Sequence, residues 1–202
     1  MKEKKLDGCR KDRLILVNKE FALAESYRPK DLTIPKVPFS SKVSDERNKL
    51  QKIAAQALER LFDAAAKEGL HLVAVSGFRS YKRQEIIFNN HLKKLGPVEA
   101  NKISAQAGHS EHQTGLAIDI TSASVDFKLT EEFAYRPEGK WVAQNAHKYG
   151  FIIRYPRGKE GLTGYSFEPW HLRYVGKKEA KEIFDQGIIL EEYLEKGLYK
   201  NI

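Results

Sequence analysis

The chain has 202 residues, of which 41% are hydrophobic and 31% are charged, and its formal net charge is +8. These values suit one soluble globular domain, with or without an extended arm, and no apolar run is long enough to span a bilayer. The single cysteine, Cys9, excludes an internal disulfide and a thiolate zinc site, so any metal centre must use histidine and carboxylate ligands.

The chain is predicted to begin with an extended arm, residues 1–45, that packs on a main domain covering residues 46–202. In the arm, the apolar run Leu14–Asn18 predicts a short strand, and the three prolines that follow it indicate an extended segment. The main domain is predicted to open with a helix near residues 45–67, where apolar residues recur at helical spacing and Gly69 suits the C-terminal cap.

Strands and helices then mix along the rest of the chain. The hydrophobic patterns predict strands at 71–77, 116–121, 151–155 and 171–175, and helices at 81–95, at 139–149 and in the C-terminal segment. We find no repeat and no low-complexity segment. Because a regular alternation of strand and helix is missing, this order favours a single α+β domain over a doubly wound one.

The strand around Asp119 has one apolar face and one short, polar face. Alternation places the apolar residues at 116, 118 and 120 on one face, and Ala117, Asp119 and Thr121 on the other. This pattern is typical of a strand that buries one face and lines a site with the other. Gly115 is expected to interrupt the strand, so His112 should approach Asp119 from the turn that leads into it.

His112, Asp119 and His171 together offer the three protein ligands of a catalytic zinc, which leaves a fourth position for water. A spare glutamate, Glu168, could then act on that water as a base. The proline that follows it argues against a helix, so we expect Glu168 and His171 on a loop entering a strand. His109, three residues before His112, is a rival ligand.

A tryptophan and an arginine near these motifs suit substrate binding. Trp170 is expected to form a wall of the site. An arginine can hold a substrate carboxylate through two parallel hydrogen bonds, and Arg79 lies on a predicted turn between a strand and a helix. Arg154 and Arg173 are rivals for this role, although their strand positions favour ion pairing.

The pattern Ser110-x-His112-x-x-Gly115-x-Ala117-x-Asp119, followed by Glu168-x-x-His171, resembles the signature of the VanY/LdcB-type D-alanyl carboxypeptidases. These are zinc peptidases of bacterial peptidoglycan in the LAS group, and the resemblance extends in order over roughly residues 14–176. It implies a central, mainly antiparallel sheet flanked by helices, as in hedgehog and DD-peptidase domains. It also implies one zinc ion held by His112, Asp119 and His171, which favours His112 over His109.

The same resemblance implies roles for four more residues. Glu168 matches the catalytic base, while Arg79, Gln84 and Ser110 match positions that hold the C-terminal end of the substrate, Arg79 with a part in catalysis too. The sequence departs from the family pattern at Phe78 and just before Gly108, and these departures bear on substrate fit rather than on the metal. The predicted site is therefore a metal centre beside a carboxylate-binding pocket.

The resemblance implies a zinc metallocarboxypeptidase, specifically an LD-carboxypeptidase that removes the C-terminal D-alanine from peptidoglycan tetrapeptide stems. A DD-carboxypeptidase or DD-dipeptidase acting on D-Ala-D-Ala termini is the alternative. A wall-binding module with zinc but no catalysis is another, and Glu168 argues against it because such a module needs no base. Serine mechanisms are disfavoured because Ser-x-x-Lys and Gly-x-Ser-x-Gly do not occur in the sequence.

The expected partner is a peptidoglycan stem peptide, and the expected state is a monomer without a transmembrane segment. Basic residues are scattered among acidic ones, as in 177–182, so we expect no nucleic-acid partner. We expect an extracellular enzyme associated with the cell wall or membrane, its signal or anchor lying outside this chain. A cytoplasmic enzyme acting on precursors is the alternative, and Leu6–Cys9 lacks the apolar stretch of a lipoprotein signal.

Overall fold

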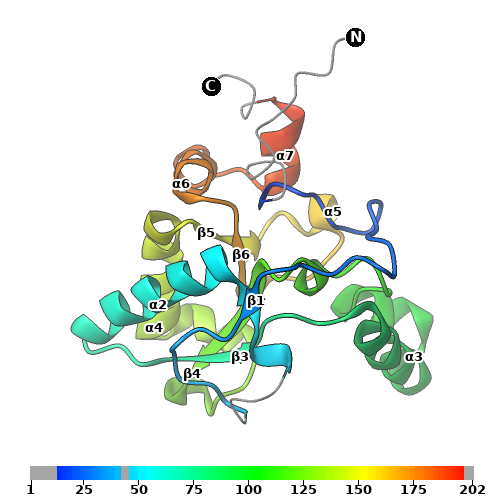
Figure 1. Cartoon of the computed structure of the whole chain (residues 1–202), viewed down its shortest axis with the longest axis horizontal. Helices are drawn as coiled ribbons and strands as arrows, with labels where there is room; N and C mark the ends of the chain where they lie inside the picture. Colours follow the sequence, from blue (N-terminus) through cyan, green and yellow to red (C-terminus); the bar gives the residue numbers. More distant parts are fainter. Residues whose placement is uncertain (1–12, 42–45, 198–202) are drawn as a thin grey trace.

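The computed structural model describes residues 13–41 and 46–197, and Figure 1 shows how their helices and strands are arranged. The helices are α2 (Lys52–Lys67), α3 (Tyr81–Ile103), α4 (Pro137–Asn145), α5 (Glu160–Thr163), α6 (Lys177–Gln186) and α7 (Leu190–Glu195). The strands are β1 (Leu32–Thr33), β2 (Leu50–Gln51), β3 (Leu72–Ser76), β4 (Ala117–Ser122), β5 (Phe151–Tyr155) and β6 (Glu168–Tyr174). Short 3-10 segments are η1 (Glu46–Asn48), η2 (Glu111–Thr114), η3 (Ala123–Val125), η4 (Glu131–Tyr135) and η5 (Ala146–Tyr149).

Four strands form the central sheet, in the order β3-β4-β6-β5, and every neighbouring pair is antiparallel. Strands β1 and β2 form a separate antiparallel ribbon. Figure 1 shows helices around the sheet, with α6 and α7 at the top of the view and α3 at the right, away from α2 and α4. The predicted α+β fold, with a mainly antiparallel sheet flanked by helices, is confirmed.

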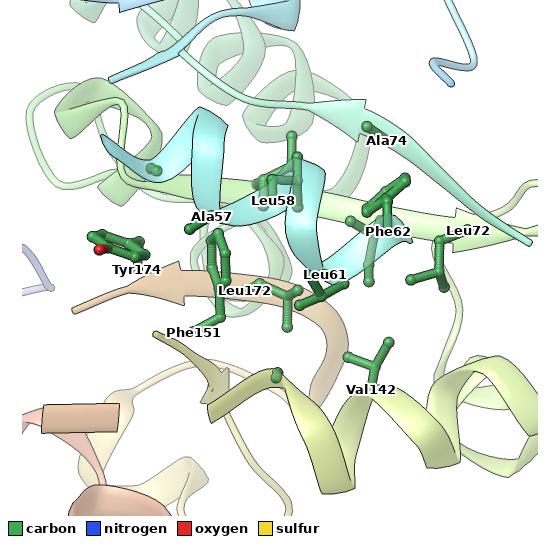
Figure 2. Close-up of a cluster of buried hydrophobic side chains, with 14 of the residues drawn as sticks. Ala57, Leu58, Leu61, Phe62, Leu72, Ala74, Val142, Phe151, Leu172 and Tyr174 are labelled. Atoms are coloured by element: carbon green, nitrogen blue, oxygen red, sulfur yellow. The ribbon is translucent and has the colours of Figure 1, made fainter. Parts of the chain in front are cut away.

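The main hydrophobic core lies on one face of the sheet. Figure 2 shows it between α2, the strands and α4, with Leu61 of α2, Val142 of α4 and Leu172 of β6 among its members. Ile118 of β4 lies directly opposite Leu172 in the register and has no exposed surface, as predicted for this face of the strand. Each large aliphatic side chain buried here stabilises the fold by about 1.5–3 kcal/mol.

The opposite face of the sheet carries polar groups where β4 and β6 meet. Asp119 of β4 lies directly opposite His171 of β6, and Ala117 lies opposite Arg173. Directly opposite residues of an antiparallel pair point to the same face, so these side chains share one surface. The sheet therefore separates an apolar core from a buried polar site.

The apolar run Leu14–Asn18 is not a strand, which corrects our prediction. Its carbonyl groups find a partner outside a ladder, since the Arg173 guanidinium donates to the carbonyl oxygens of Arg13 (2.9 Å) and Ile15 (2.8 Å). Leu14 packs in a second hydrophobic cluster with residues of α6 and α7. Burial against these helices accounts for the apolar character of the run without strand pairing.

The bounds of α2 and α3 differ from the predicted ones, and the helix predicted at 139–149 is α4 followed by the 3-10 segment η5. Helix α2 begins at Lys52 rather than near residue 45, because Leu50 and Gln51 pair with β1. The helix that was expected to end at Gly96 does break there, where Gly96 has φ +76°, but a second helical segment continues to Ile103. Proline is compatible with the first turn of a helix, which explains how Pro97 restarts it.

The described part of the N-terminal segment lies on the main domain. The Leu23 N–H donates to the Gly108 carbonyl at 2.9 Å, and Phe39 forms a parallel bridge with Ala74. The rest of the expected arm, including Leu6–Cys9, lies outside the described residues. Over the described ranges, none of the helices combines the length and the apolar character needed to cross a bilayer.

Candidate active site

His112, Asp119 and His171 converge on the polar face of the sheet. One potential ligand atom from each lies within 4.8 Å of the others, and all three residues are buried. The His112 Nε2 atom is 3.3 Å from Asp119 Oδ2, and the His171 Nδ1 atom is 3.1 Å from Asp119 Oδ1. Two imidazole nitrogens and a carboxylate oxygen thus face one shared point.

Local structure explains how His112 reaches this point. It lies on η2, which is followed by Gly115 in a left-handed conformation with φ +66°. A Cβ atom at position 115 would approach Leu32 Cδ2 to 2.8 Å, so this turn favours glycine. The His112 Nδ1–H donates to the Gly77 carbonyl at 2.7 Å, which directs Nε2 toward Asp119. A ligating histidine is normally oriented by such a hydrogen bond from its other ring nitrogen.

The donor set fits a zinc ion. Asp119 Oδ1 is buried and has no hydrogen-bond partner among the described residues, so a cation between the three side chains would complete its environment. Burial lowers the pKa of His112 and favours its neutral ring, the form that binds metal. Burial also disfavours charge on His171, but the neighbouring carboxylates of Asp119 and Glu111 outweigh burial and raise the pKa of His171 to about 9. The surrounding carboxylates therefore favour a positive charge at this centre.

The rival histidine does not join the cluster. His109 Nδ1 instead lies 2.7 Å from the carbonyl oxygen of Asn18. Its ring therefore faces the N-terminal segment rather than Asp119. The structure thus separates two histidines that sequence spacing left as alternatives.

Glu168 lies at the edge of the cluster and outside its three-residue set. It is the first residue of β6, which corrects our prediction of a loop. A register shift between Ile153 and Tyr155 interrupts strict alternation along the β5–β6 pair, and Glu168 Oε2 comes within 3.7 Å of His171 Nδ1. Burial raises the pKa of Glu168 to about 7, so near neutral pH its carboxyl can both accept and release a proton.

Arg79 lies next to the cluster in a fixed orientation. Its Nη1 donates to Gln84 Oε1 at 2.8 Å, its Nη2 donates to Ser76 Oγ at 3.2 Å, and Nη2 lies 3.9 Å from Asp119 Oδ2. Gln84 is fully buried behind it, where its amide donates to the Ala105 carbonyl at 2.6 Å. The structure therefore places Gln84 as a support of Arg79, not as part of the cleft wall.

A cleft of about 260 Å³ opens over these groups. Arg79, Ser110, Glu168 and Trp170 line it together with the cluster. Ser110 precedes η2, and its side chain makes no capping hydrogen bond to that segment. Apolar side chains complete the walls of the cleft, namely Ile87, Ile103 and Leu129.

Sequence reasoning missed one buried carboxylate, Glu111. Arg154 and Arg173, our rivals for substrate binding, both donate to Glu111 Oε1, at 2.7 and 2.6 Å, and have no exposed surface. They are ion-pair partners, as their strand positions suggested, and they do not line the cleft. Two arginines on the site face of a buried sheet require a buried anion, and this was the signal that could have identified Glu111.

Comparison with known proteins places these residues in a matched region. The family model described as "VanY: D-alanyl-D-alanine carboxypeptidase" matches residues 47–177. The chain is 53% identical over 198 residues to YodJ of Bacillus subtilis (strain 168), covering 96% of this chain and 72% of YodJ. The matched span contains the three clustered residues and Glu168.

Two solved structures extend the comparison to three dimensions. An LdcB LD-carboxypeptidase matches with a TM-score of 0.89 and 53% identity, covering 96% of this chain and 92% of that chain. A variant of the vancomycin-resistance D,D-pentapeptidase VanY, solved in complex with Zn(II), matches with a TM-score of 0.73 and 33% identity, covering 91% of this chain and 99% of that chain. The fold expected from the sequence is thus found in both solved structures, and the second of them contains the expected metal, zinc.

Proposed function

The chain belongs to the VanY family of D-alanyl-D-alanine carboxypeptidases, and from this membership we propose that it is a zinc-dependent LD-carboxypeptidase. Its substrate is a peptidoglycan tetrapeptide stem, from which it releases the terminal D-alanine. The observation that carries the proposal is the convergence of His112, Asp119 and His171 in a chain that matches an LdcB LD-carboxypeptidase with a TM-score of 0.89.

The site residues divide the chemistry between them. When bound by His112, Asp119 and His171, zinc polarises the scissile carbonyl and makes water a nucleophile near neutral pH. The Glu168 carboxylate accepts the proton of the attacking water and returns it to the nitrogen of the departing D-alanine. Arg79 holds the terminal carboxylate of the substrate, which restricts cleavage to the last peptide bond.

The remaining site residues position these groups. Gln84 and Ser76 fix the guanidinium of Arg79 through hydrogen bonds of 2.8 and 3.2 Å, so little conformational freedom is lost when the substrate binds. Ser110 and Trp170 line the cleft, and we propose that they contact the end of the peptide.

The test is a side-by-side assay of a tetrapeptide stem ending in D-Ala and a pentapeptide stem ending in D-Ala-D-Ala. We expect D-alanine release from the tetrapeptide with a kcat/KM at least tenfold above that for the pentapeptide. Mass spectrometry of both products identifies the bond that is cut. The reverse preference would make the enzyme a DD-carboxypeptidase, which the 33% identity to the VanY D,D-pentapeptidase keeps as the second candidate.

The expected setting is the cell wall, where stem peptides with free D-alanine termini occur. An enzyme that reaches such termini outside the membrane would act on mature wall, whereas one inside would act on precursors. We propose the former, with a monomer as the active unit. Cell fractionation, with detection of this chain by an antibody, distinguishes the location outside the membrane from the location inside it.

A further inference from the structure

Glu111 is a charged residue with no role in the chemistry described above, yet it is among the most buried residues near the cluster. It is 1% exposed, and its Oε1 atom accepts hydrogen bonds from Arg154 and Arg173. The side chains of both arginines are fully buried as well, so Glu111 is paired with two buried cations at the base of the site.

A second carboxylate completes this buried ion network. Glu191 of α7 accepts from Arg154 Nη1 at 2.9 Å and from Arg154 Nη2 at 2.6 Å. Glu111 and Glu191 together balance the charges of Arg154 and Arg173. Removal of either carboxylate therefore changes the charge of the network by the same amount, but only Glu111 also faces His171.

The other oxygen of Glu111 faces a metal-ligating histidine. Glu111 Oε2 is 3.5 Å from His171 Nε2, and neither atom has another hydrogen-bond partner among the described residues. This separation exceeds an ordinary N–H···O hydrogen bond by about 0.3 Å. The opposite nitrogen, His171 Nδ1, is the one that faces Asp119 at 3.1 Å.

We propose that Glu111 is a positioning residue for the zinc site: its Oε2 accepts the Nε2–H of His171 and thereby presents Nδ1 to the metal. The inference rests on the proposed zinc site and deepens it. The Gly77 carbonyl orients His112 in the same way from the other nitrogen of that ring. Each histidine ligand then has its own acceptor, one a backbone carbonyl and the other a carboxylate clamped by two arginines.

Glutamine at position 111 cannot replace this arrangement. A carboxylate has two acceptor oxygens, one for the arginines and one for His171, whereas an amide has one oxygen and an NH2 group that only donates. In Glu111→Gln either the two arginines or His171 loses its acceptor. Because outer partners of metal-binding histidines typically contribute about 10- to 100-fold in metal affinity, we expect a loss in that range.

The experiment measures zinc affinity of the full chain by competition with a chromophoric chelator, for wild type, Glu111→Gln and Glu191→Gln. Glu191→Gln is the matched control, since it removes one carboxylate from the same arginine network but leaves Glu111 against His171. We expect Glu111→Gln to bind zinc about 10- to 100-fold more weakly and Glu191→Gln to stay within about threefold of wild type. Equal losses in the two variants, or none in Glu111→Gln, would overturn the inference.

A measurement on the wild type keeps the inference testable if Glu111→Gln does not fold. Long-range ¹H–¹⁵N NMR of the zinc-loaded protein reports which ring nitrogen of His171 carries the proton. We expect a protonated Nε2 and a metal-bound Nδ1, and the opposite assignment would refute the role of Glu111. Failure of the wild type to bind zinc at all would instead refute the proposed function, so the two failures are distinguishable.

Discussion

Replacement of Glu168 by glutamine should remove most of the activity and leave the zinc site in place. The substitution keeps the size of the side chain, but it replaces one carboxylate oxygen by an NH2 group that only donates and removes the ability to accept a proton. Three carboxylates line the cleft, and the other two are engaged, Asp119 with both clustered histidines and Glu111 with two arginines. No other cleft carboxylate is therefore available as a substitute base.

The expected loss in kcat is about 10²- to 10⁴-fold, the usual contribution of a positioned general acid–base. It corresponds to about 3–5 kcal/mol of activation free energy. The assay is D-alanine release from the tetrapeptide, with zinc content measured on the same sample. Glu99→Gln serves as the control, because Glu99 is 57% exposed and pairs with Lys102 on the surface of α3.

Stability provides a second readout for Glu168. Burial raises the pKa of this carboxyl to about 7, so its charged form destabilises the metal-free fold. Chelator-treated wild type should therefore lose stability relative to Glu168→Gln as the pH rises from about 4.5 to about 7. A glutamine variant with kcat within tenfold of wild type would refute the role of base, and a variant without zinc would make Glu168 a ligand.

Other perturbations test separate parts of the site. Removal of the metal with a chelator should abolish D-alanine release and lower the melting temperature, and added zinc should restore both; a melting temperature insensitive to the chelator would contradict the metal centre. Arg79→Lys should reduce kcat/KM by about 10- to 100-fold, because lysine cannot keep the guanidinium geometry that Gln84 supports, while Arg83→Lys on the exposed side of α3 should have no effect. Gly115→Ala should destabilise the fold and weaken zinc binding, because its Cβ would approach Leu32 Cδ2 to 2.8 Å at φ +66°, and an unchanged urea midpoint would contradict this.

Several elements were predictable because their signals are local. The alternation around Asp119 identified both the face of β4 that packs in the apolar core and the face that carries the carboxylate, although both faces are buried. Gly115 marked the turn that brings His112 to this strand, and Gly96 marked the break in α3. In each case the pattern lies within a few residues, where helical and strand periods or backbone conformation determine it.

Other features depend on partners far away in the chain. Leu14–Asn18 has the composition of a strand, but the carbonyls of Ile15 and of the preceding Arg13 accept from Arg173, a residue about 160 positions later. Glu168 reaches the site through a register shift against β5 that alternation within β6 does not contain. Local periodicity carries no information on which distant group satisfies a buried donor.

The sequence by itself predicted the ligand types and a small set of candidate residues, and it indicated the face of β4 on which Asp119 lies. Only the tertiary structure decided that His109 is excluded, that Gln84 supports Arg79 from behind, and that Glu111 stands against His171. The physical reason is that a buried charge needs an opposite charge or a hydrogen-bond partner, and the fold decides which group lies close enough to supply it. That partner is selected by packing in three dimensions rather than by spacing along the chain.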